Sequence, residues 1–510
     1  MKDGILILDF GSQYTQLIAR RIRENGVYSE IYPFHLPPER IREIAPAGIV
    51  LSGGPSSVLS PQAPLISTEL LELGIPVLGI CYGMQLITKL SGGIVEKSTY
   101  REYGRSVMRI LHSSPLFEGV RDESVVWMSH GDSVIKLPEG FEKIASSDDC
   151  EFVAAHNVKK KIFLVQFHPE VVHTEEGEKI LRNFVFNICN SKPTWDMGNF
   201  LDEQIRLLRE RCRGKKTVLG VSGGVDSTTL AVIAQKAIGN DVTAVFINNG
   251  LLRLNEEKEV LNNLQNRLNL KIDYIDASRI FLNRLKGVVS PEKKRKIIGE
   301  TFIKVFYKGL KNFDYLIQGT LYPDVIESSS VKGPSSTIKT HHNRVKEILR
   351  MEREGRVIEP FKFLFKDEVR KIAKLLGIPD DILNRHPFPG PGLAVRIIGE
   401  VTTSRLNILR QADFIFIEEL KAAGYYDKVW QAFCVFLPVK SVGVMGDERA
   451  YGNVIALRAI TSVDGMTANW AELPYSLLDR VANRIIRQIK EVNRVVYDVT
   501  SKPPATIEWE

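Results

Sequence analysis

The sequence has 510 residues, of which 44% are hydrophobic and 25% are charged, so its length and composition predict two to four globular domains of an ordinary soluble type. The formal net charge of +7 is a small excess for this length and gives no reason to expect a nucleic-acid partner. No basic start precedes a long apolar run, and no uncharged stretch is long enough to span a membrane, so we expect a cytoplasmic protein.

The number and spacing of the cysteines argue against two further classes of protein, disulfide-linked and zinc-binding proteins. The cysteines are odd in number and form no CxxC pair, which argues against a disulfide framework and against a zinc site. At least one of them is therefore a candidate for chemistry. The five are Cys81, Cys150, Cys189, Cys212 and Cys434.

The first 190 residues have the pattern of an α/β domain. Short apolar runs at 4–8, 49–51 and 76–80 each end in a glycine-rich or reactive loop, and helix-like segments fall between some of them. The polar, proline-containing residues 190–194 interrupt this pattern before a helical segment at 197–213. We therefore place the first domain boundary at this interruption.

Cys81 lies directly after the apolar strand that ends at Ile80 and directly before a helix-like segment, between Gly79 and Gly83. This is the spacing of a nucleophile elbow, because the glycines permit a strained turn and the helix N-terminus favours the thiolate. A cysteine taken alone is more often a buried structural residue. The interpretation therefore depends on the partners of Cys81.

Two other predicted strand ends supply such partners. Ser52-Gly53-Gly54 follows the strand at 49–51, and the amides of Gly54 and Tyr82 would form an oxyanion hole. The strand at 163–167 ends in His168-Pro169-Glu170, where His168 can take and return a proton while Glu170 orients its ring. The sequence thus predicts a catalytic triad of Cys81, His168 and Glu170.

These strings, in this order, resemble the triad family of glutamine amidotransferases over nearly all of residues 3 to 190. The resemblance implies a three-layer, open-sheet glutaminase domain, with a glutamyl thioester on Cys81 and release of ammonia. It also implies that Gln85, Ser129 and Asp132 hold the charged end of glutamine. The simpler interpretation of the last two residues is a polar loop.

A second site begins where the strand Thr217–Val221 runs into a glycine-rich loop, which a helix-like segment at 228–238 follows. Glycine amides, serine hydroxyls and a helix N-terminus together favour phosphate binding. Asp226 within this loop predicts a magnesium ion bound with ATP. The loop lacks the lysine of a Walker loop, which counts against γ-phosphoryl transfer.

This loop instead resembles the pyrophosphate loop of the N-type ATP pyrophosphatases, in which a substrate oxygen attacks the α-phosphate. The resemblance implies a Rossmann-like domain, whose further strands we expect at 242–247, 272–275 and 315–317. The expected ATP contacts are Ser222, Gly223, Gly224, Val225, Asp226, Ser227 and Thr228.

The rest of the chain divides into a polar stretch and a smaller last region. Residues 328–356 are charged, contain paired histidines and predict a mobile surface segment. After the proline- and glycine-rich residues 386–392, a small α/β region runs to Glu510. Within it, the segment 506–509 is interpreted as a short apolar strand that must dock.

Strings spread over the whole chain resemble the family of glutamine-hydrolysing GMP synthetases. The resemblance implies an enzyme that uses glutamine, ATP and xanthosine monophosphate (XMP), with no redox cofactor, and gives GMP, glutamate, AMP and pyrophosphate. It implies domains at 3–193 (class I glutamine amidotransferase), 194–385 (ATP pyrophosphatase) and 386–510 (XMP binding and homodimerisation). The matching strings lie at 9–14, 249–253, 318–328, 385–393, 441–447 and 502–510.

The same resemblance implies two further sets of site residues. The XMP contacts would be Arg253, Gly390, Pro391, Gln431, Arg494, Lys502, Ile507 and Glu508. A lid over the site would carry Asp324, Glu327, Lys339, His341 and His342. The sequence departs from the family pattern after Asn343 and at Asn248, where an aspartate is usual.

Two alternatives remain open at this point. Pyrophosphate loops also serve NAD, asparagine and argininosuccinate synthetases and RNA-thiolating enzymes, although those families lack the strings at 389–392 and 502–510. A nucleotide sensor built on inactive domains is the second alternative. The intact residues Cys81, His168 and Glu170 argue against it.

Overall fold

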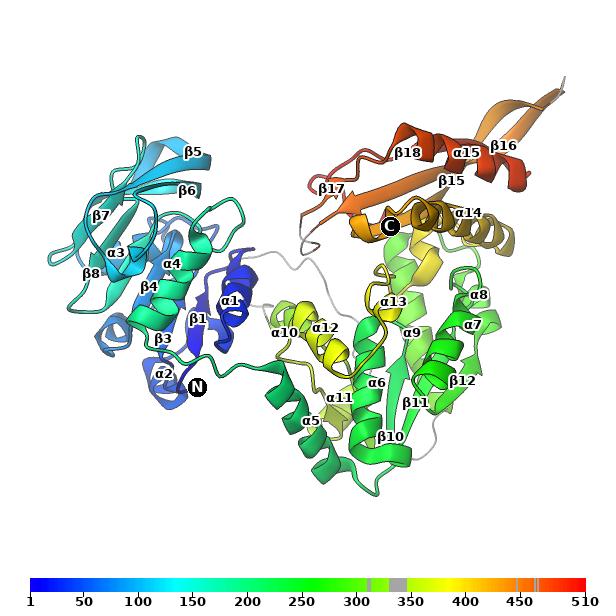
Figure 1. Cartoon of the computed structure of the whole chain (residues 1–510), viewed down its shortest axis with the longest axis horizontal. Coiled ribbons are helices and arrows are strands. Elements are labelled where there is room, and N and C mark those ends of the chain that lie inside the picture. The colour runs from blue at the N-terminus through cyan, green and yellow to red at the C-terminus, as the bar shows by residue number, and fades with distance from the viewer. Residues whose placement is uncertain (310–312, 330–345, 446–447, 463–464, 466) are drawn as a thin grey trace. The chain divides into compact units, whose positions relative to one another are not determined.

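The computed structural model describes the backbone of residues 1–309, 313–329, 346–445, 448–462, 465 and 467–510, without the side chains of 98–102, 309, 327–329, 346–349, 445 and 448. The described chain forms two compact units (Figure 1). Unit 1 contains Met1–Phe200 and the helix α10 (Tyr322–Ser329), and unit 2 contains Leu201–Leu321 and the described residues from 346 onward. Among the described residues, no helix combines the length and apolarity needed to cross a bilayer.

Unit 1 is built on a nine-stranded sheet whose first half is parallel and whose second half is antiparallel. The strands of the parallel half are buried on both faces, as a parallel sheet covered by helices requires. In sheet order the strands are β2 (Ser29–Pro33), β1 (Ile5–Asp9), β3 (Gly48–Leu51), β4 (Val77–Ile80), β9 (Ile162–Val165), β8 (Ala154–Asn157), β7 (Glu142–Ser146), β5 (Ile94–Ile110) and β6 (Glu123–Lys136).

Strand β1 shows the three layers directly. Leu6 and Leu8 pack in one core cluster with Met84 and Ile87 of α3 (Tyr82–Leu90). Because successive side chains of a strand point to opposite faces, the buried Ile5 lies on the other face. The predicted three-layer α/β fold is confirmed. The remaining helices of this part are α1 (Thr15–Glu24), α2 (Pro38–Ile44) and α4 (Gly177–Asn183).

Helix α10 joins unit 1 through its first residue. The Ile31 amide donates a 2.5 Å hydrogen bond to the hydroxyl oxygen of Tyr322, and the Arg23 guanidinium lies 4.9 Å from the centre of the same ring. A segment that the sequence assigned to the second predicted domain is therefore packed on the first unit.

Unit 2 contains a five-stranded, all-parallel sheet, which confirms the Rossmann-like expectation. In sheet order the strands are β12 (Ile272–Asp276), β11 (Val242–Asn248), β10 (Thr217–Val221), β13 (Tyr315–Ile317) and β14 (Val357–Ile358). The helices are α5 (Met197–Cys212), of which Leu201 onward lies in this unit, α6 (Val225–Ile238), α7 (Glu256–Leu261), α8 (Ser278–Leu285), α9 (Pro291–Gly309), α11 (Lys346–Arg353), α12 (Lys366–Leu375) and α13 (Asp380–Leu383).

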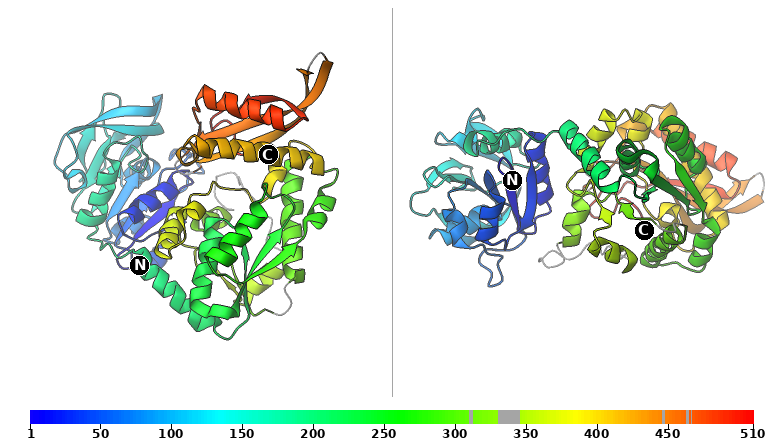
Figure 2. Two further views of the ribbon diagram at one scale, coloured as in Figure 1. Left: turned by 45° about the vertical axis from the view of Figure 1, so that its right-hand side comes forward. Right: turned by 90° about the horizontal axis from the view of Figure 1, so that it is seen from below.

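The last part of unit 2 is a second, smaller α/β layer (Figure 2). Its sheet is centred on β16 (Glu448–Thr461), which pairs antiparallel with β15 (Gln431–Met445) and β17 (Asn469–Trp470) and parallel with β18 (Val492–Tyr497). Helices α14 (Thr403–Ala422) and α15 (Tyr475–Gln488) pack together beside this sheet.

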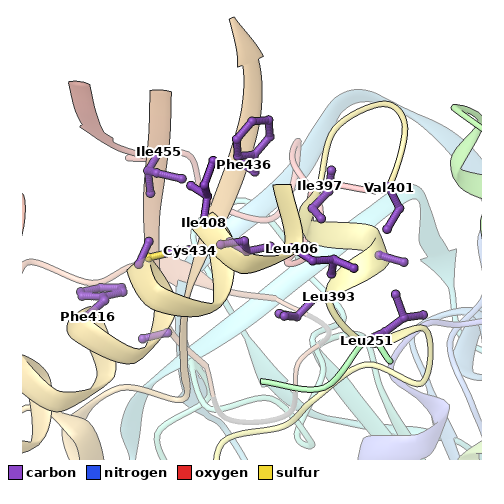
Figure 3. Close-up of a cluster of buried hydrophobic side chains, with 14 of the residues drawn as sticks. Leu251, Leu393, Ile397, Val401, Leu406, Ile408, Phe416, Cys434, Phe436 and Ile455 are labelled. Carbon is purple, nitrogen blue, oxygen red and sulfur yellow. The ribbon is translucent and has the colours of Figure 1, made fainter. Parts of the chain in front are cut away.

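One hydrophobic core joins the two sheets of unit 2. Leu251, which follows β11, is buried in the same cluster as Leu393, Phe416 of α14, Cys434 of β15 and Ile455 of β16 (Figure 3). The residues that connect the two layers are thus as deeply buried as those within each layer.

Two expectations about local structure are wrong. The segment 506–509 is not a strand but a series of bends, because Arg458 takes the carbonyl oxygens of Thr506 and Ile507 as hydrogen-bond acceptors. It does dock, since Ile507 packs against a cluster formed by Phe433 and other apolar residues. The expected mobile segment at 328–356 is wrong at its end, which contains the helix α11 with Met351 buried in the core, whereas residues 330–345 lie outside the described residues.

Candidate active sites

Cys81 occupies a strained turn between β4 and α3. Its φ of 51° and ψ of −102° are rare for a residue with a side chain. The neighbouring glycines are required by space, since a Cβ on Gly83 would lie 2.5 Å from the carbonyl oxygen of Leu51 and one on Gly79 would lie 2.9 Å from the Gly83 backbone. The Cys81 amide donates to the Val165 carbonyl at 2.8 Å, which ties the turn to β9.

His168 and Glu170 lie beside this turn. Nδ1 of His168 donates to Oε1 of Glu170 at 2.8 Å, and the Cys81 side chain is near enough to the His168 ring to influence its pKa. Burial lowers the pKa of His168, but the Glu170 carboxylate and the Cys81 side chain outweigh it, so the pKa lies well above its ordinary value. The arrangement can hold an imidazolium beside the Cys81 sulfur.

The residues predicted to form the oxyanion hole lie beside Cys81 and His168. A Cβ on Gly53 would lie 2.9 Å from Cε1 of His168 and 3.7 Å from Cβ of Cys81, so the glycine loop closes directly over the pair. In the described part of the chain, no group accepts a hydrogen bond from the amide of Gly54 or of Tyr82. These two donors are therefore available to an oxygen of a bound substrate.

The three residues expected to hold glutamine surround Cys81 from β6 and α3. The Ser129 carbonyl accepts a hydrogen bond from Sγ of Cys81 at 3.5 Å, and Nε2 of Gln85 donates to the Asp132 carbonyl at 2.8 Å. Ser129 and Asp132 belong to the strand β6 rather than to a polar loop. The Asp132 carboxylate accepts from the Ser57 hydroxyl at 2.5 Å.

Sequence reasoning missed two neighbours of this site. The Tyr14 ring packs edge-on against the His168 ring at 5.2 Å between centroids, and Ser57 contacts Asp132 as described above. Tyr14 stood in one of the family strings, which was the available signal. Ser57 carried none, because a serine in a loop is common everywhere.

The predicted phosphate loop forms a small network at the start of α6. The Ser222 and Ser227 hydroxyls lie 3.1 Å apart, and the Ser222 amide donates to Oγ of Ser227 at 3.1 Å. Gly223 has a φ of +75°, and a Cβ there would lie 2.4 Å from a methyl group of Val260. Residue 223 must therefore be glycine for the loop to keep this form.

The other members of the loop take different positions. Thr228 is fully buried in the first turns of α6, and Val225 begins that helix. The Gly224 amide lies 3.4 Å from Oγ of Ser222. The Asp226 carboxylate lies 3.8 Å from Nζ of Lys366, which comes from α12. The loop thus presents hydroxyls, amides and one carboxylate at the carboxyl end of β10.

A magnesium ion fits this donor set in part. Magnesium in nucleotide sites is commonly held by one or two carboxylates together with substrate phosphates, and Asp226 supplies one such group. Among the described residues, no cluster of three or more metal-ligating side chains occurs. Among the described residues of this loop, Asp226 is the carboxylate that would contact an ATP-bound ion.

Asn248, which departs from the family pattern, is held by several partners. Its amide nitrogen donates to Glu257 at 2.6 Å and approaches the Tyr274 hydroxyl at 3.3 Å. Its side-chain oxygen accepts from the Gly250 amide at 2.8 Å. An asparagine can serve both a donor and an acceptor role here, which an ionised aspartate cannot.

Several residues of the expected XMP set meet in unit 2. Glu508 accepts hydrogen bonds from Nε2 of Gln431 at 2.9 Å and from Arg396 at 2.8 and 3.0 Å. The Phe388 ring lies 4.6 Å from the Arg253 guanidinium and 5.3 Å from that of Arg396. Two arginines therefore share one aromatic ring, and one of them, Arg396, also binds the carboxylate that Gln431 contacts.

The charges of this cluster are unevenly balanced. Burial lowers the pKa of Arg253, whose nearest carboxylate is that of Asp413 at 3.6 Å. Burial also opposes the charge of Arg396, but Glu508 outweighs it and raises the pKa. Nε and Nη2 of Arg253 and Nη1 of Arg396 are buried without a hydrogen-bond partner in the described residues. The cluster therefore has unused donors that an anionic or carbonyl-rich ligand could satisfy.

Arg253 also lines a cavity of about 660 Å³ together with Arg385, Asp413, Lys421 and Tyr426. A volume of this size suits a nucleotide. Gln431 and Glu508 are not among the residues that line it. Arg253 is thus the residue that the cavity and the Glu508 cluster have in common.

The other expected XMP residues are placed less centrally. Lys502 donates to the Gly465 carbonyl at 2.8 Å, and Gly390 is exposed beside Pro391. Arg494 pairs with Val454 on the sheet, whereas Gln431 pairs with Ile460. Six residues of an extended strand span about 20 Å, so Arg494 lies well away from Gln431.

The lid set can be placed only in part. Asp324 lies exposed on α10. Glu327 belongs to the same helix, but its side chain lies outside the described residues. Lys339, His341 and His342 lie outside them entirely.

Family comparisons match three regions of the chain. A model described as Glutamine amidotransferase class-I matches residues 6–188, and one described as NAD synthase matches residues 197–320. A third, described as GMP synthase C terminal domain, matches residues 418–509. The first two define the class of protein: a glutamine amidotransferase joined to an ATP-consuming domain of the pyrophosphatase type.

Curated relatives identify the member of this class. A protein named "GMP synthase [glutamine-hydrolyzing]" from Aquifex aeolicus (strain VF5) is 56% identical over 509 residues, which are 99% of each chain. The protein of the same name from Brachyspira hyodysenteriae is 53% identical over 511 residues, or 100% of this chain and 99% of the relative. That from Chlorobium phaeobacteroides is 56% identical over 515 residues, or 99% of this chain and all of the relative.

The chain belongs to the family of glutamine-hydrolysing GMP synthases. It is a carbon–nitrogen ligase that uses ATP and takes its nitrogen from glutamine. The family resemblance drawn from the sequence is confirmed, and both alternatives to it are excluded.

Proposed function

We propose that Cys81, His168 and Glu170 release ammonia from glutamine, and that the loop 222–228 directs ATP to the adenylation of XMP. The observation that carries the first half is the hydrogen-bonded His168–Glu170 pair beside Cys81, which occupies a strained, glycine-flanked turn. The second half rests on the phosphate loop, whose amides and hydroxyls point from a helix N-terminus without a Walker lysine.

In the glutaminase half, the Cys81 thiolate attacks the carboxamide carbon of glutamine, and the amides of Gly54 and Tyr82 stabilise the oxyanion. His168 gives a proton to the departing ammonia and then takes one from the water that hydrolyses the thioester. Glu170 keeps the ring oriented and supports its positive charge. Gln85, Ser129 and Asp132 position the charged end of the substrate.

In the synthetase half, the XMP oxygen on carbon 2 attacks the α-phosphorus of ATP, and pyrophosphate leaves. Ammonia then attacks carbon 2, and AMP leaves with that oxygen to give GMP. The loop 222–228 holds the triphosphate through its amides and hydroxyls. Asp226 would hold a magnesium ion bound with ATP, and the ion would neutralise charge on the phosphates. Asp324, Glu327, Lys339, His341 and His342 are proposed as the lid residues of the adenylation reaction.

For XMP we propose the cluster around Phe388. Glu508 is suited to accept from a purine N–H, because a carboxylate is a strong acceptor, and the unused donors of Arg253 are suited to an anion. Gln431, Lys502, Ile507, Gly390 and Pro391 complete the contacts. The domain boundaries at 193 and 385 and the cytoplasmic location belong to the same proposal.

We further propose a homodimer formed through the last region. Its support is an apolar surface on the β15–β16 hairpin, where Val442, Val444 and Tyr451 are between half and three-quarters exposed. A dimer would also explain how Arg494 can contact XMP although it lies far from Gln431, since a second copy could bring this residue to the XMP site of its partner.

The test of the main proposal separates the two halves. With XMP and ATP present, Cys81→Ala is expected to lose glutamine-dependent GMP formation by at least about a thousandfold while keeping synthesis from added ammonium salt. Cys150→Ala, which removes another buried cysteine, serves as the control. Parallel loss of both activities in a folded Cys81→Ala protein contradicts the division of labour.

A further inference from the structure

Among the described residues of unit 2, three cationic side chains are fully buried, and all three bind the same stretch of chain. Lys294, Arg396 and Arg458 each have 0% side-chain exposure and come from α9, from the turn before Ile397 and from β16. Each of the three has at least one hydrogen-bond partner in the segment 498–510. The segment has little regular structure of its own, so these cations determine its path.

Lys294 makes the contacts that the established chemistry does not explain. Its ammonium donates to the carbonyl oxygens of Ala394 at 3.2 Å and Ile397 at 2.6 Å, and to the carboxylate of Glu510. An ammonium has three donors, and all three are used. The other carboxylate oxygen of Glu510 accepts from the Gly399 amide at 3.1 Å, so both sides of the ion pair are held.

These contacts bracket the Arg396–Glu508 pair. Ala394 and Ile397 lie on either side of Arg396 in the chain, and Glu510 is two residues beyond Glu508. One ammonium therefore fixes the backbone that carries the arginine and the segment that carries the glutamate. Arg396 then meets Glu508 through two nearly parallel hydrogen bonds, at 2.8 and 3.0 Å.

Stability alone gives a weak reason for this arrangement. Burying an ion pair costs several kilocalories of desolvation per mole, and well-packed apolar residues of similar volume are often as stabilising. Burial accordingly lowers the pKa of Lys294 even though Glu510 opposes the shift. What an ion pair with three directed hydrogen bonds provides, and apolar packing does not, is a single fixed geometry.

We propose that Lys294 is a positioning residue for XMP: by clamping Glu510 and the turn around Arg396, it holds the Glu508 carboxylate where the purine binds. This inference rests on the proposed role of Glu508 as an XMP contact. Lys294 itself touches no substrate. Its effect is transmitted through the backbone of two segments more than one hundred residues apart in sequence.

The experiment measures ammonia-dependent synthesis by the full-length protein with XMP and MgATP. Lys294→Met is expected to raise the KM for XMP about 10- to 100-fold, because the lost ion pair with Glu510 supports the proposed XMP contact Glu508. Little change is expected in the KM for ATP, because this ion pair does not support the phosphate loop. Glu510→Gln, which keeps the shape and removes the charge, is the second variant and serves if Lys294→Met does not fold. Lys293→Met, an exposed neighbour on α9, is the matched control and is expected to behave as the parent.

A double-mutant comparison distinguishes positioning from general support. If Lys294 acts through Glu508, the KM increase of Lys294→Met combined with Glu508→Gln is expected to be no larger than that of Glu508→Gln alone. Multiplying effects, or equal increases in the KM for ATP and for XMP, would overturn the inference. If Glu508→Gln by itself leaves the KM for XMP unchanged, the proposed XMP site fails instead. An increase with Glu508→Gln but none with Lys294→Met or Glu510→Gln refutes the positioning role alone.

Discussion

Asn248 shows how a single departure from a family pattern can be accommodated by its neighbours. Its amide donates to Glu257, and Glu257 also accepts from the Tyr274 hydroxyl at 2.6 Å. An aspartate at this position would place a second carboxylate against Glu257. In this chain, the amide is thus matched to a glutamate and a tyrosine that come from α7 and β12.

Asn248→Asp is therefore expected to destabilise the protein by about 1 to 2 kcal/mol at pH 7, the lower figure reflecting partial exposure of the pair. Like charges raise the pKa of one carboxyl, so the loss should shrink on lowering the pH to 5, where one of the two takes up a proton. Thermal unfolding at the two pH values measures this. The double variant Asn248→Asp with Glu257→Gln should recover most of the loss, and a loss independent of pH would contradict the explanation.

His386 provides a second prediction at this scale. Burial lowers its pKa to about 4, and its ring stacks on Tyr426 with 3.8 Å between ring centres. Because the folded pKa is below the unfolded one, the contribution of His386 to stability is complete above pH 6.5 and is lost as the pH falls towards 4. The change is at most about 3 kcal/mol.

Calorimetry between pH 7 and pH 4.5 tests this prediction. His386→Gln should lower the unfolding temperature at pH 7 but should flatten its decline with acid, since the variant has nothing to titrate at this position. His112→Gln, at an exposed position, should leave the slope of the parent unchanged. A slope in His386→Gln as steep as that of the parent would show that other groups cause the decline.

At the scale of elements, the phosphate loop depends on one residue without a side chain. Gly223→Ala adds both a left-handed backbone penalty of about 1 kcal/mol and a contact of 2.4 Å with Val260. We expect the loop to open and the KM for ATP to rise at least about tenfold in the ammonia-dependent reaction, because the amides no longer converge on the phosphates.

Gly239→Ala is the matched control for this loop. Gly239 lies at the other end of α6 with a φ of +58°, and a Cβ there would meet nothing within 4 Å. It should cost stability without changing the KM for ATP. Equal changes in both variants would mean that backbone strain in α6, rather than the shape of the loop, controls ATP binding.

The elements that could be predicted from sequence are those whose burial is nearly complete. Strands such as β10 and β11 are continuous apolar runs because helices cover both faces, and their predicted limits agree with the structure within about a residue or two. The same reasoning wrongly predicted a strand at 506–509. Its backbone acceptors are taken by Arg458, which is almost fifty residues away in sequence, and no local pattern records such a partner.

The candidate sites divide in the same way. Cys81 and His168 follow strands that are neighbours in a parallel sheet, so topology brings them together once the strands are recognised. Lys294, Arg396 and Phe388 were not predicted, because a lysine, an arginine or a phenylalanine has no special local spacing. Their importance arises from packing between segments that the sequence keeps far apart.

At the scale of the whole molecule, the proposed homodimer can be tested at the exposed hairpin surface. Val442 and Tyr451 are directly opposite each other on β15 and β16, and each is at least half exposed. Val442→Asp with Tyr451→Asp is expected to convert the proposed dimer into a monomer, because two charges would be buried without partners. Sedimentation velocity measures the change.

Tyr475→Asp is the control for this experiment, since Tyr475 is 90% exposed on α15, away from the hairpin. If Arg494 serves the partner's XMP site, the monomeric hairpin variant should also show a raised KM for XMP. A hairpin variant that sediments as the parent does would remove the proposed interface.

The core that joins the two sheets of unit 2 also decides where this chain can be divided. A cut before residue 386 would leave Leu251 on one fragment and Leu393, Phe416 and Cys434 on the other, each exposing apolar surface that is now buried. Exchanging the segment 386–510 for that of another enzyme would therefore expose this core. Recombination at this point is not expected to give a folded enzyme with a different acceptor substrate. We therefore expect a new acceptor specificity to arise from single substitutions that keep the shared hydrophobic core of unit 2 well packed.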